Sequence, residues 1–176
     1  AELEGAALER RAREFEDALA PLTKVGRVGC WLAQFPVSLV CSSASCTRLE
    51  RLAASLGAAP LVLELRHRSW FDPSSLARIE ALGVSLAAVD LPASGNHPPP
   101  EAPVVGPIGY LRLHGRNSRA WFDRAAGRDQ RYDYSYSEPE VAELARRARG
   151  IAAGRPETYV VANNHFGGQA LANALE

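Results

Sequence analysis

Side chains capable of chemistry gather where three short apolar runs of this 176-residue sequence end. The runs begin at Leu61, Gly109 and Thr158. Their polar ends hold three of the four histidines, several arginines and a pair of asparagines, namely Glu64, Arg66, His67, Arg112, His114, Arg116, Asn163, Asn164 and His165. A buried strand that ends in this way is expected to face a cleft with its C-terminal tip, which is where parallel α/β proteins bind ligands.

These residue types suit an anionic ligand. Arginine presents a planar fork of donors that matches a phosphate or a carboxylate. Alternation along a strand puts Glu64 on one face with Arg66, and Arg112 on one face with His114. Glu64 or His114 could then act as a general acid or base. The rival interpretation, weighed equally for Glu64 and the two arginines, is a buried ion pair that only satisfies its own charges.

The candidate ligand-binding residues share a position at or just after an apolar run, and they are Gln34, Arg66, Asp90, Arg112, Arg116, Asn163 and Asn164. Of the two asparagines, we expect one to face the ligand and the other to cap a helix or to bond neighbouring backbone.

A divalent-metal site is the weaker hypothesis for the same region. His67, His114 and His165 could join Glu64 and Asp90 around a metal of the kind that barrel hydrolases use. No two of these histidines share a short spacing such as His-x-His, so we expect no metal and no cofactor. No serine lies in a Gly-x-Ser-x-Gly turn, which leaves covalent catalysis with little support.

Strands and helices must alternate to position these side chains, and the apolar spacing predicts that they do. Helices are expected over residues 3–20, closed by Pro21, over 49–56, over 72–83 from an Asp72 cap, from a Ser137–Glu140 capping box onward, and over 167–175. Strands are expected over 28–35, 61–65, 84–89, 110–113 and 158–162. Polar residues at every strand end favour a TIM-type barrel over an open sheet, with residues 1–176 as a single domain.

Two long connections interrupt the alternation. Residues 92–107 hold six of the twelve prolines and are expected to form a stiff loop. Residues 115–136 mix arginines with aromatic residues, a pattern that can stack bases and meet phosphates. Aspartates cancel much of that charge, so a loop folded over the barrel rim is favoured over a nucleic-acid surface.

Composition excludes several classes of function. The formal net charge is zero, so no global field draws the chain to nucleic acid or to an anionic membrane. Hydrophobic residues make up 47% of the chain, but no apolar stretch reaches the roughly 18 residues of a membrane span. Cys30, Cys41 and Cys46 fit no metal spacing and are expected to be reduced thiols of a cytoplasmic protein.

Several motifs in the same order resemble those of one family, and they are Gln34-Phe35-Pro36, Glu64-Leu-Arg66-His-Arg-Ser69-Trp70, Tyr110-Leu-Arg112-Leu-His114-Gly115-Arg116, Val160-Val-Ala-Asn163-Asn164-His165 and Gly168-Gln-Ala170-Leu-Ala-Asn173-Ala174. From about residue 20 onward the chain is similar to the YecE-like domain-of-unknown-function family, number seventy-two. The resemblance implies a TIM-type barrel with no settled activity. It also implies strand-end residues at Gln34, Glu64, Arg66, Trp70, Asp90, Arg112, His114, Gly115, Asn163 and Asn164.

Members of that family begin with about three further strands, which this sequence lacks. We therefore expect the last five strand–helix units of an incomplete barrel, with two open edges that another segment or chain covers. Three hypotheses of function follow. The first is binding or processing of a small anionic, phosphorylated ligand. The second is nucleic-acid binding or metal-assisted phosphodiester hydrolysis through residues 115–136. The third is a truncated remnant without activity.

Overall fold

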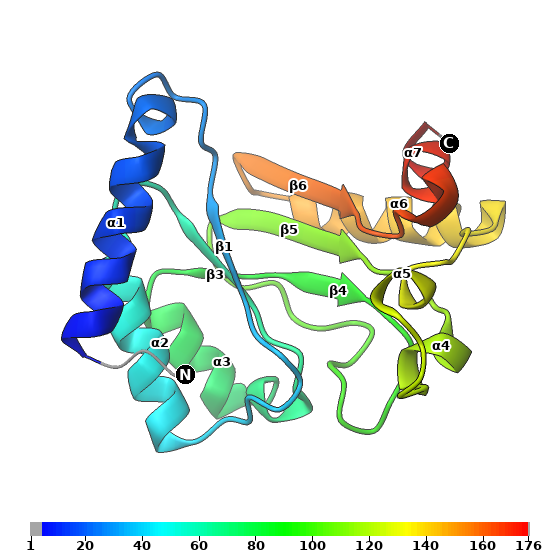
Figure 1. The fold of residues 1–176 in the computed structure, drawn as a ribbon, viewed down its shortest axis with the longest axis horizontal. Coiled ribbons are helices and arrows are strands. Elements are labelled where there is room, and N and C mark those ends of the chain that lie inside the picture. Colours follow the sequence, from blue (N-terminus) through cyan, green and yellow to red (C-terminus); the bar gives the residue numbers. More distant parts are fainter. Residues whose placement is uncertain (1–4, 176) are drawn as a thin grey trace.

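Six short strands carry the polar ends in the computed structural model, which describes residues 5–175 (Figure 1). They are β1 (Trp31–Gln34), β2 (Leu61–Glu64), β3 (Ser85–Leu86), β4 (Ala88–Asp90), β5 (Ile108–Leu113) and β6 (Glu157–Ala162). All neighbours pair in parallel, in the orders β1–β2–β3 and β4–β5–β6. Because parallel neighbours point the same way, the C-terminal tips of each sheet lie along one edge, next to α4 and α5 in the case of β4 and β5.

The segment from β3 to β4 joins the two sheets. The amide of Leu86 donates to the Val105 carbonyl at 3.1 Å, on the side of β5, whereas the amide of Ala87 donates to the Leu63 carbonyl of β2 at 2.9 Å. The Ser85 hydroxyl also accepts from the Ile108 amide at 2.9 Å. Successive backbone groups thus bond to opposite neighbours and keep β2 and β5 on either side of one segment.

The prediction of an α/β protein with parallel strands is confirmed, and that of one strand over 84–89 is wrong, because pairing breaks at Ala87. Among residues 5–175 the strands form two three-stranded sheets and no closed barrel. Strand β1 pairs only with β2, and β6 pairs only with β5. Each sheet therefore has an outer edge strand.

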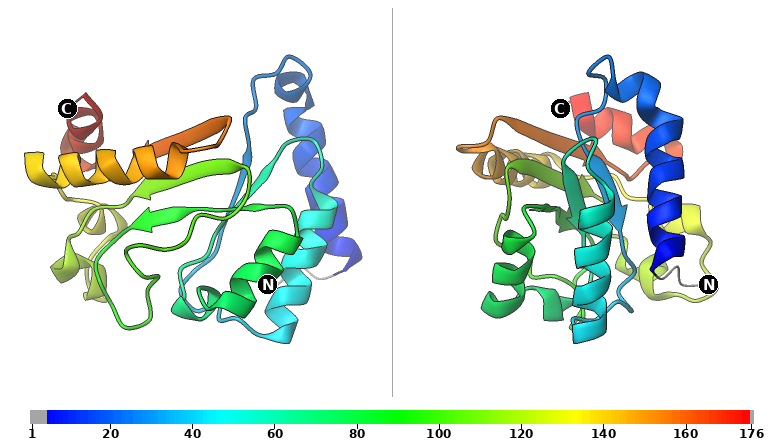
Figure 2. Two further views of the ribbon diagram at one scale, coloured as in Figure 1. Left: turned by 180° about the vertical axis from the view of Figure 1, so that it is seen from behind. Right: turned by 90° about the vertical axis from the view of Figure 1, so that its left-hand side faces the viewer.

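Within the described part of the chain, seven α-helices accompany the strands, and they are α1 (Ala6–Thr23), α2 (Ser43–Ser55), α3 (Pro73–Ala81), α4 (Ser118–Phe122), α5 (Arg128–Arg131), α6 (Glu138–Ala152) and α7 (Gln169–Leu175). Two short 3₁₀ turns, η1 (Arg68–Trp70) and η2 (Phe166–Gly168), follow the ends of β2 and β6. The first three α-helices lie together beside β1–β3, and α6 and α7 lie beside β5 and β6 (Figure 2).

Helix ends follow the predicted capping chemistry in two places. The Asp72 carboxylate accepts from the amides of Ser74 and Ser75 at the start of α3. The Glu140 carboxylate accepts from the Ser137 amide at 2.9 Å at the start of α6, as the capping box predicts. Both carboxylates satisfy amides that the first helical turn leaves without partners.

Two predicted helix boundaries and one predicted loop differ from the structure. Pro21 lies inside α1, which continues to Thr23, and the predicted start at residue 3 lies outside the described residues. Helix α2 begins at Ser43 because the Ser42 hydroxyl accepts from the Ser45 amide and caps it. Residues 115–136, predicted to be a loop, contain α4 and α5, which are too short to show an apolar period.

Apolar side chains cover both faces of the strands. One face packs under the helices, where Leu63 and Leu111 are fully buried. The other, called the inner face below, carries Val62, Ile108 and Tyr110. Side chains alternate along a strand, so Glu64 and Arg112 belong to this inner face as well. Among the described helices, none is both long and apolar enough to cross a membrane.

Candidate functional site

Polar side chains meet at the C-terminal end of the inner face. Gln34 and Glu64 are the last residues of β1 and β2 and stand opposite each other in the register. Arg112 pairs in register with Val161, two residues before Asn163. We call the residues that meet here the inner cluster, consisting of Gln34, Glu64, Arg66, Arg112, His114 and Asn163.

Glu64 lies at the centre of the inner cluster and is fully buried. One carboxylate oxygen accepts from Nε of Arg66 at 2.6 Å, and the other accepts from an Nη of Arg112 at 2.6 Å. Burial alone would raise the pKa of Glu64, but the hydrogen bond from His114 and the nearby positive charges outweigh it and lower the pKa to about 2. Glu64 is therefore ionised at neutral pH.

Arg112 joins three strands through its guanidinium group. The same Nη that reaches Glu64 donates to Oε1 of Gln34 at 2.6 Å, and the other Nη donates to Oδ1 of Asn163 at 3.1 Å. The side chain is only 10% exposed, and its Nε has no hydrogen-bond partner within the described residues. A buried donor without a partner is uncommon in folded proteins and marks a place where a further acceptor would be stabilised.

His114 is fully buried beside Glu64. Burial lowers its pKa and outweighs the hydrogen bond and charge of Glu64, so the imidazole is neutral at pH 7. We assign the proton to Nε2, which lies 3.3 Å from Glu64 Oε1, and this leaves Nδ1 to accept from the Asn163 amide at 3.3 Å. Both ring nitrogens then have partners.

Aromatic rings from residues 115–136 cover His114. The centroids of Trp121 and Tyr132 lie 6.1 Å and 5.9 Å from that of His114, and the two rings are 5.7 Å apart. His165 extends the group, because its ring lies 5.3 Å from Tyr132. The sequence alone could not show which of these rings would pack on His114. The presence of aromatic residues in a segment that follows a strand end does, however, indicate that some of them cover the site.

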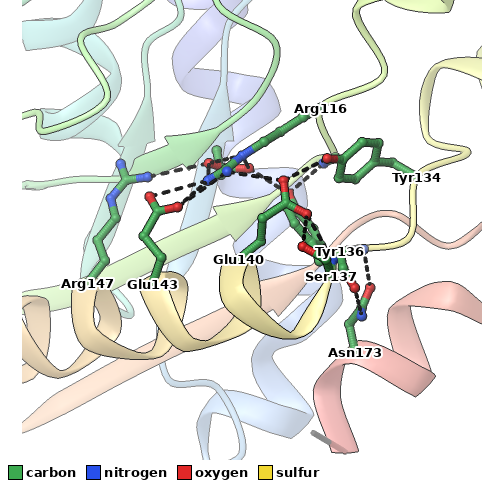
Figure 3. A network of polar contacts seen from close by, with 10 residues as sticks. Arg116, Tyr134, Tyr136, Ser137, Glu140, Glu143, Arg147 and Asn173 are labelled. Carbon is green, nitrogen blue, oxygen red and sulfur yellow. Dashed lines mark hydrogen bonds and ion pairs between the residues drawn. The ribbon is translucent and has the colours of Figure 1, made fainter.

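Asp90 and Arg116 lie in a second group on the other side of β4, facing α6. Arg116 donates to both carboxylate oxygens of Asp90 through its Nε and Nη groups at 2.8–3.1 Å. The Tyr136 hydroxyl donates to Asp90 at 2.7 Å and accepts from the Gly115 amide at 2.8 Å. We call this group the outer cluster, which also includes three residues of α6, namely Glu140, Glu143 and Arg147 (Figure 3).

Carboxylates surround Arg116 in the outer cluster. Hydrogen bonding to Asp90 raises the pKa of Arg116 above its ordinary value, and ion pairs with Glu140 and Glu143 occupy its remaining donors at 3.3 Å. Burial and the charge of Asp90 raise the pKa of Tyr136, which stays protonated. The sequence did not point to Tyr136, whose partner lies forty-six positions earlier in the chain.

The two adjacent asparagines point to different parts of the molecule. Asn163 faces the inner cluster, whereas Asn164 is fully buried and donates to the Tyr134 carbonyl and to Asn173 of α7. Asn173 in turn bonds the backbone of Tyr136 in both directions. Asn164 therefore holds the 134–136 segment against α7 and does not face the inner cluster.

The proline-rich loop, residues 92–107, forms one wall of a pocket of about 1080 Å³ beside the outer cluster. Its lining includes His67 and Ser69 after β2, Asp90, and Arg147 of α6. His97 of the loop stacks on Phe122 of α4 with centroids 5.8 Å apart. The two long connections thus meet at the end of the molecule where the strands finish.

The three histidines considered as metal ligands do not converge. His67 contacts Ser69 at 2.8 Å, His114 contacts Glu64, and His165 lies 3.8 Å from Asp129. Within residues 5–175, no three His, Cys, Asp or Glu side chains are grouped as metal ligands.

Comparison with known proteins supplies the family. A family model described as "Protein of unknown function DUF72" matches residues 2–176. The UPF0759 protein YunF of Bacillus subtilis is 27% identical over 171 residues, which are 92% of this chain and 61% of YunF. The chain therefore spans less than two thirds of this relative's length.

Two solved structures are similar to the chain. A DUF72 family protein from Thermotoga maritima has a TM-score of 0.87 at 32% identity, over 95% of this chain and 63% of that protein. Another, from Enterococcus faecalis, has a TM-score of 0.86 at 29% identity, over 97% of this chain and 64% of that protein. The number-seventy-two family named from the sequence is thus confirmed, and the fold is shared with these structures.

Proposed function

We propose a ligand-binding role for this chain, which belongs to the DUF72 family, a family of proteins of unknown function. The inner cluster is the site, and a small anionic, phosphorylated molecule is the ligand. One observation carries the proposal: a buried carboxylate, Glu64, lies between two guanidinium groups, Arg66 and Arg112, at the ends of parallel strands.

The charges of the inner cluster do not cancel. Glu64 is ionised and His114 is neutral, so two guanidinium charges face one carboxylate and leave one positive charge. Inside a protein such an excess attracts an anion more strongly than it would in water. In the outer cluster, by contrast, three carboxylates face the guanidinium groups of Arg116 and Arg147, so the charge in excess there is negative.

The accessible side of the inner cluster carries donors. The Arg66 side chain is 19% exposed, Gln34 is exposed and Asn163 is half-buried, so each can reach a ligand from the rim. Behind this rim, Arg112 contributes a buried Nε group that has no partner among the described residues. Guanidinium and amide donors at one rim match the several acceptor oxygens of a phosphate group.

If the site also performs chemistry, His114 is the candidate general acid or base. A neutral imidazole beside a carboxylate can take up a proton, as general bases do near neutral pH. Glu64 is a weaker candidate, since a pKa of about 2 makes it a poor base. We assign Glu64 the role of holding the two guanidinium groups in place.

We further propose that the strands form an arc of a TIM-type barrel, corresponding to the C-terminal part of the YecE-like fold. All-parallel pairing, two outer edge strands and polar tips on the inner face support this arrangement. The missing part of the barrel wall would lie beyond β1 and β6, supplied by another segment or chain. A cytoplasmic location is also proposed, and the three unpaired cysteines support it.

A thermal-shift titration tests the proposal. Inorganic phosphate, ribose 5-phosphate and chloride at matched ionic strength are added to the wild-type chain, to Arg66→Gln and to Arg13→Gln. We expect both phosphates to raise the melting temperature of the wild type and of Arg13→Gln, because Arg13 is exposed on α1 and outside the inner cluster. Arg66→Gln should lose the shift and still melt cooperatively.

Equal shifts with Arg66→Gln and the wild type would contradict the proposal, as would no shift with either phosphate. A fluorescently labelled oligonucleotide provides the last arm. Tight binding that weakens steeply with salt and survives Arg66→Gln would favour the nucleic-acid hypothesis instead.

A further inference from the structure

The N-terminus of α2 brings two thiols together. Ser42 caps this helix, so Cys41 is the residue before the cap and Cys46 is the fourth helical residue. These two positions are neighbours in the hydrophobic staple, in which a residue before the cap packs on the helix one turn later. Here both are cysteines, and their sulfur atoms lie 3.9 Å apart.

We propose that Cys41 and Cys46 are a redox modification site that forms a reversible disulfide when the protein meets a hydroperoxide. A disulfide needs a sulfur–sulfur distance of about 2 Å, so the two side chains must approach by roughly 2 Å. Rotation of the side chain of Cys41, which lies outside the helix, can supply this approach while α2 keeps its backbone.

The two thiols differ in ways that assign them different steps. Cys41 is half-buried and meets the oxidant first, whereas Cys46 is 7% exposed. Burial, and then contact with Cys41, raise the pKa of Cys46, so Cys46 remains a thiol until Cys41 has reacted.

The reaction then balances in two steps. Cys41 gives up its proton and its sulfur attacks one oxygen of hydrogen peroxide, the O–O bond breaks, and the departing hydroxide takes up that proton and leaves as water. Cys46 gives up its proton and attacks the sulfur of the resulting sulfenic acid, and the S–O bond breaks to release a second water. Two thiols have lost two electrons, and one peroxide has been reduced to two waters.

The surroundings tolerate the new bond. Cys41 Sγ lies 3.2 Å from the Ser75 hydroxyl and would leave it. That hydroxyl keeps the Asp72 carboxylate at 2.6 Å and the Ser69 carbonyl at 3.2 Å as acceptors, so no buried polar group loses its last partner.

The backbone around Cys41 adjoins the pocket beside the proline-rich loop. The Cys41 amide donates to the Ser69 hydroxyl at 2.8 Å, and the Trp70 indole donates to the Leu39 carbonyl at 2.7 Å. Ser69 and Asp72 line that pocket. Rotation of the Cys41 side chain leaves both of these hydrogen bonds in place, so the pocket wall and the buried Trp70 keep their positions.

Thiol mapping of the whole chain tests the proposal. The reduced protein is treated with hydrogen peroxide, its remaining thiols are alkylated, and it is cleaved with chymotrypsin, which separates Cys30 from the other two cysteines after Trp31. We expect Cys30 to be alkylated, and the peptide that holds Cys41 and Cys46 to be unalkylated and lighter by two hydrogen atoms. A dithiol reductant should restore both thiols.

Two variants sharpen the result. Cys30→Ser should behave as the wild type, whereas Cys46→Ser should leave Cys41 as a sulfenic acid that dimedone traps. Alkylation of both Cys41 and Cys46 after peroxide treatment would overturn the proposal, and so would a disulfide that contains Cys30 or joins two chains. The wild-type map decides the question even if Cys46→Ser fails to fold.

Discussion

Glu64 is the residue on which the geometry of the inner cluster depends. Its two oxygens hold Arg66 and Arg112 at 2.6 Å, and one of them also lies 3.3 Å from His114. Removing its charge would leave two guanidinium groups facing each other in a poorly solvated space. Such an arrangement is costly because a buried charge without its partner keeps its full desolvation penalty.

We therefore expect Glu64→Gln to lower the free energy of unfolding by about 3–5 kcal/mol, the usual cost of breaking a buried ion pair from one side. Urea denaturation at pH 7 measures this loss. Glu80→Gln on the exposed side of α3 is the matched control and should change stability by less than about 0.5 kcal/mol. A similar small effect for Glu64→Gln would mean that the carboxylate does not hold the guanidinium groups.

The lowered pKa of Glu64 predicts how stability depends on pH. A carboxyl group whose pKa is depressed in the folded state stabilises it above the ordinary pKa of about 4.5, and this contribution is lost as the pH falls toward 2. The full contribution is about 3 kcal/mol, from 1.36 kcal/mol for each unit of pKa. The pKa of His114 is also lowered, so its contribution begins to fall below pH 6.5 and acts in the same direction.

Urea midpoints measured from pH 7 to pH 3 check this dependence. The wild type should lose stability across this range, and Glu64→Gln should lose less below pH 4.5 because it has no carboxyl group left to protonate at this position. Parallel curves for the two proteins would contradict the assignment of the low pKa to Glu64.

Residue patterns in the sequence located the inner cluster only in part. Strand alternation was enough to place Glu64 with Arg66 and Arg112 with His114, since side-chain direction follows from the backbone. The sequence could not show that Asp90 lies outside the inner cluster. The face of the sheet on which its side chain lies depends on the break in strand pairing at Ala87. The rings of Trp121 and Tyr132 come from a segment whose path no local period reveals.

Elements at the strand ends depend on tight backbone turns. Gly115 joins the two clusters, with His114 before it and Arg116 after it. Its φ of +88° is strained for any residue with a side chain, and a Cβ there would lie 2.7 Å from Cβ of Tyr134. Gly150, by contrast, lies within α6, and a Cβ there would meet no atom within 4 Å.

The two glycines should respond to alanine in opposite ways. We expect Gly115→Ala to destabilise the chain by about 1–3 kcal/mol through backbone strain. Gly150→Ala should stabilise it by about 0.5–1 kcal/mol, because alanine favours a helix interior. Thermal or urea denaturation separates the two. Stabilisation by Gly115→Ala would show that the turn after β5 does not need a left-handed backbone.

The sequence largely predicted which segments form helices and strands, but it predicted only some of the residues at which they begin and end. The N-cap residues Asp72 and Ser137 predicted where α3 and α6 begin. Ser and Asp at the N-cap, and Glu three residues later, accept hydrogen bonds from the amides at the start of the helix. Helices α4 and α5 have only five and four residues, so neither can display a repeating apolar face. The split between β3 and β4 arises from pairing with two different neighbours, which is a tertiary effect.

At the scale of the whole molecule, the two outer edge strands, β1 and β6, each have one side that pairs with no other described strand. Val160 lies within β6 and is 51% exposed, and Leu171 and Leu175 of the neighbouring α7 are 68% and 80% exposed. An edge strand flanked by apolar side chains is a template for pairing with another chain. The chain by itself should therefore associate as its concentration rises.

Sedimentation over a range of concentrations measures this association. Val160→Lys should weaken it, since a lysine on an edge strand opposes pairing. Val25→Lys is the control, because Val25 is 67% exposed in the turn after α1 and belongs to no strand. Association that is unchanged by Val160→Lys would place the contact elsewhere.

Binding of an anion between the guanidinium groups at the strand ends is reported most directly by the ¹H–¹⁵N resonances of the arginine side chains. Arg112 Nε has no partner among the described residues, and Arg66 Nε donates to Glu64. With both signals assigned through single substitutions, titration of inorganic phosphate should shift them together and to saturation, while the signal of exposed Arg13 stays in place. Shifts confined to exposed arginines, or no shift of Arg66 and Arg112, would contradict the account.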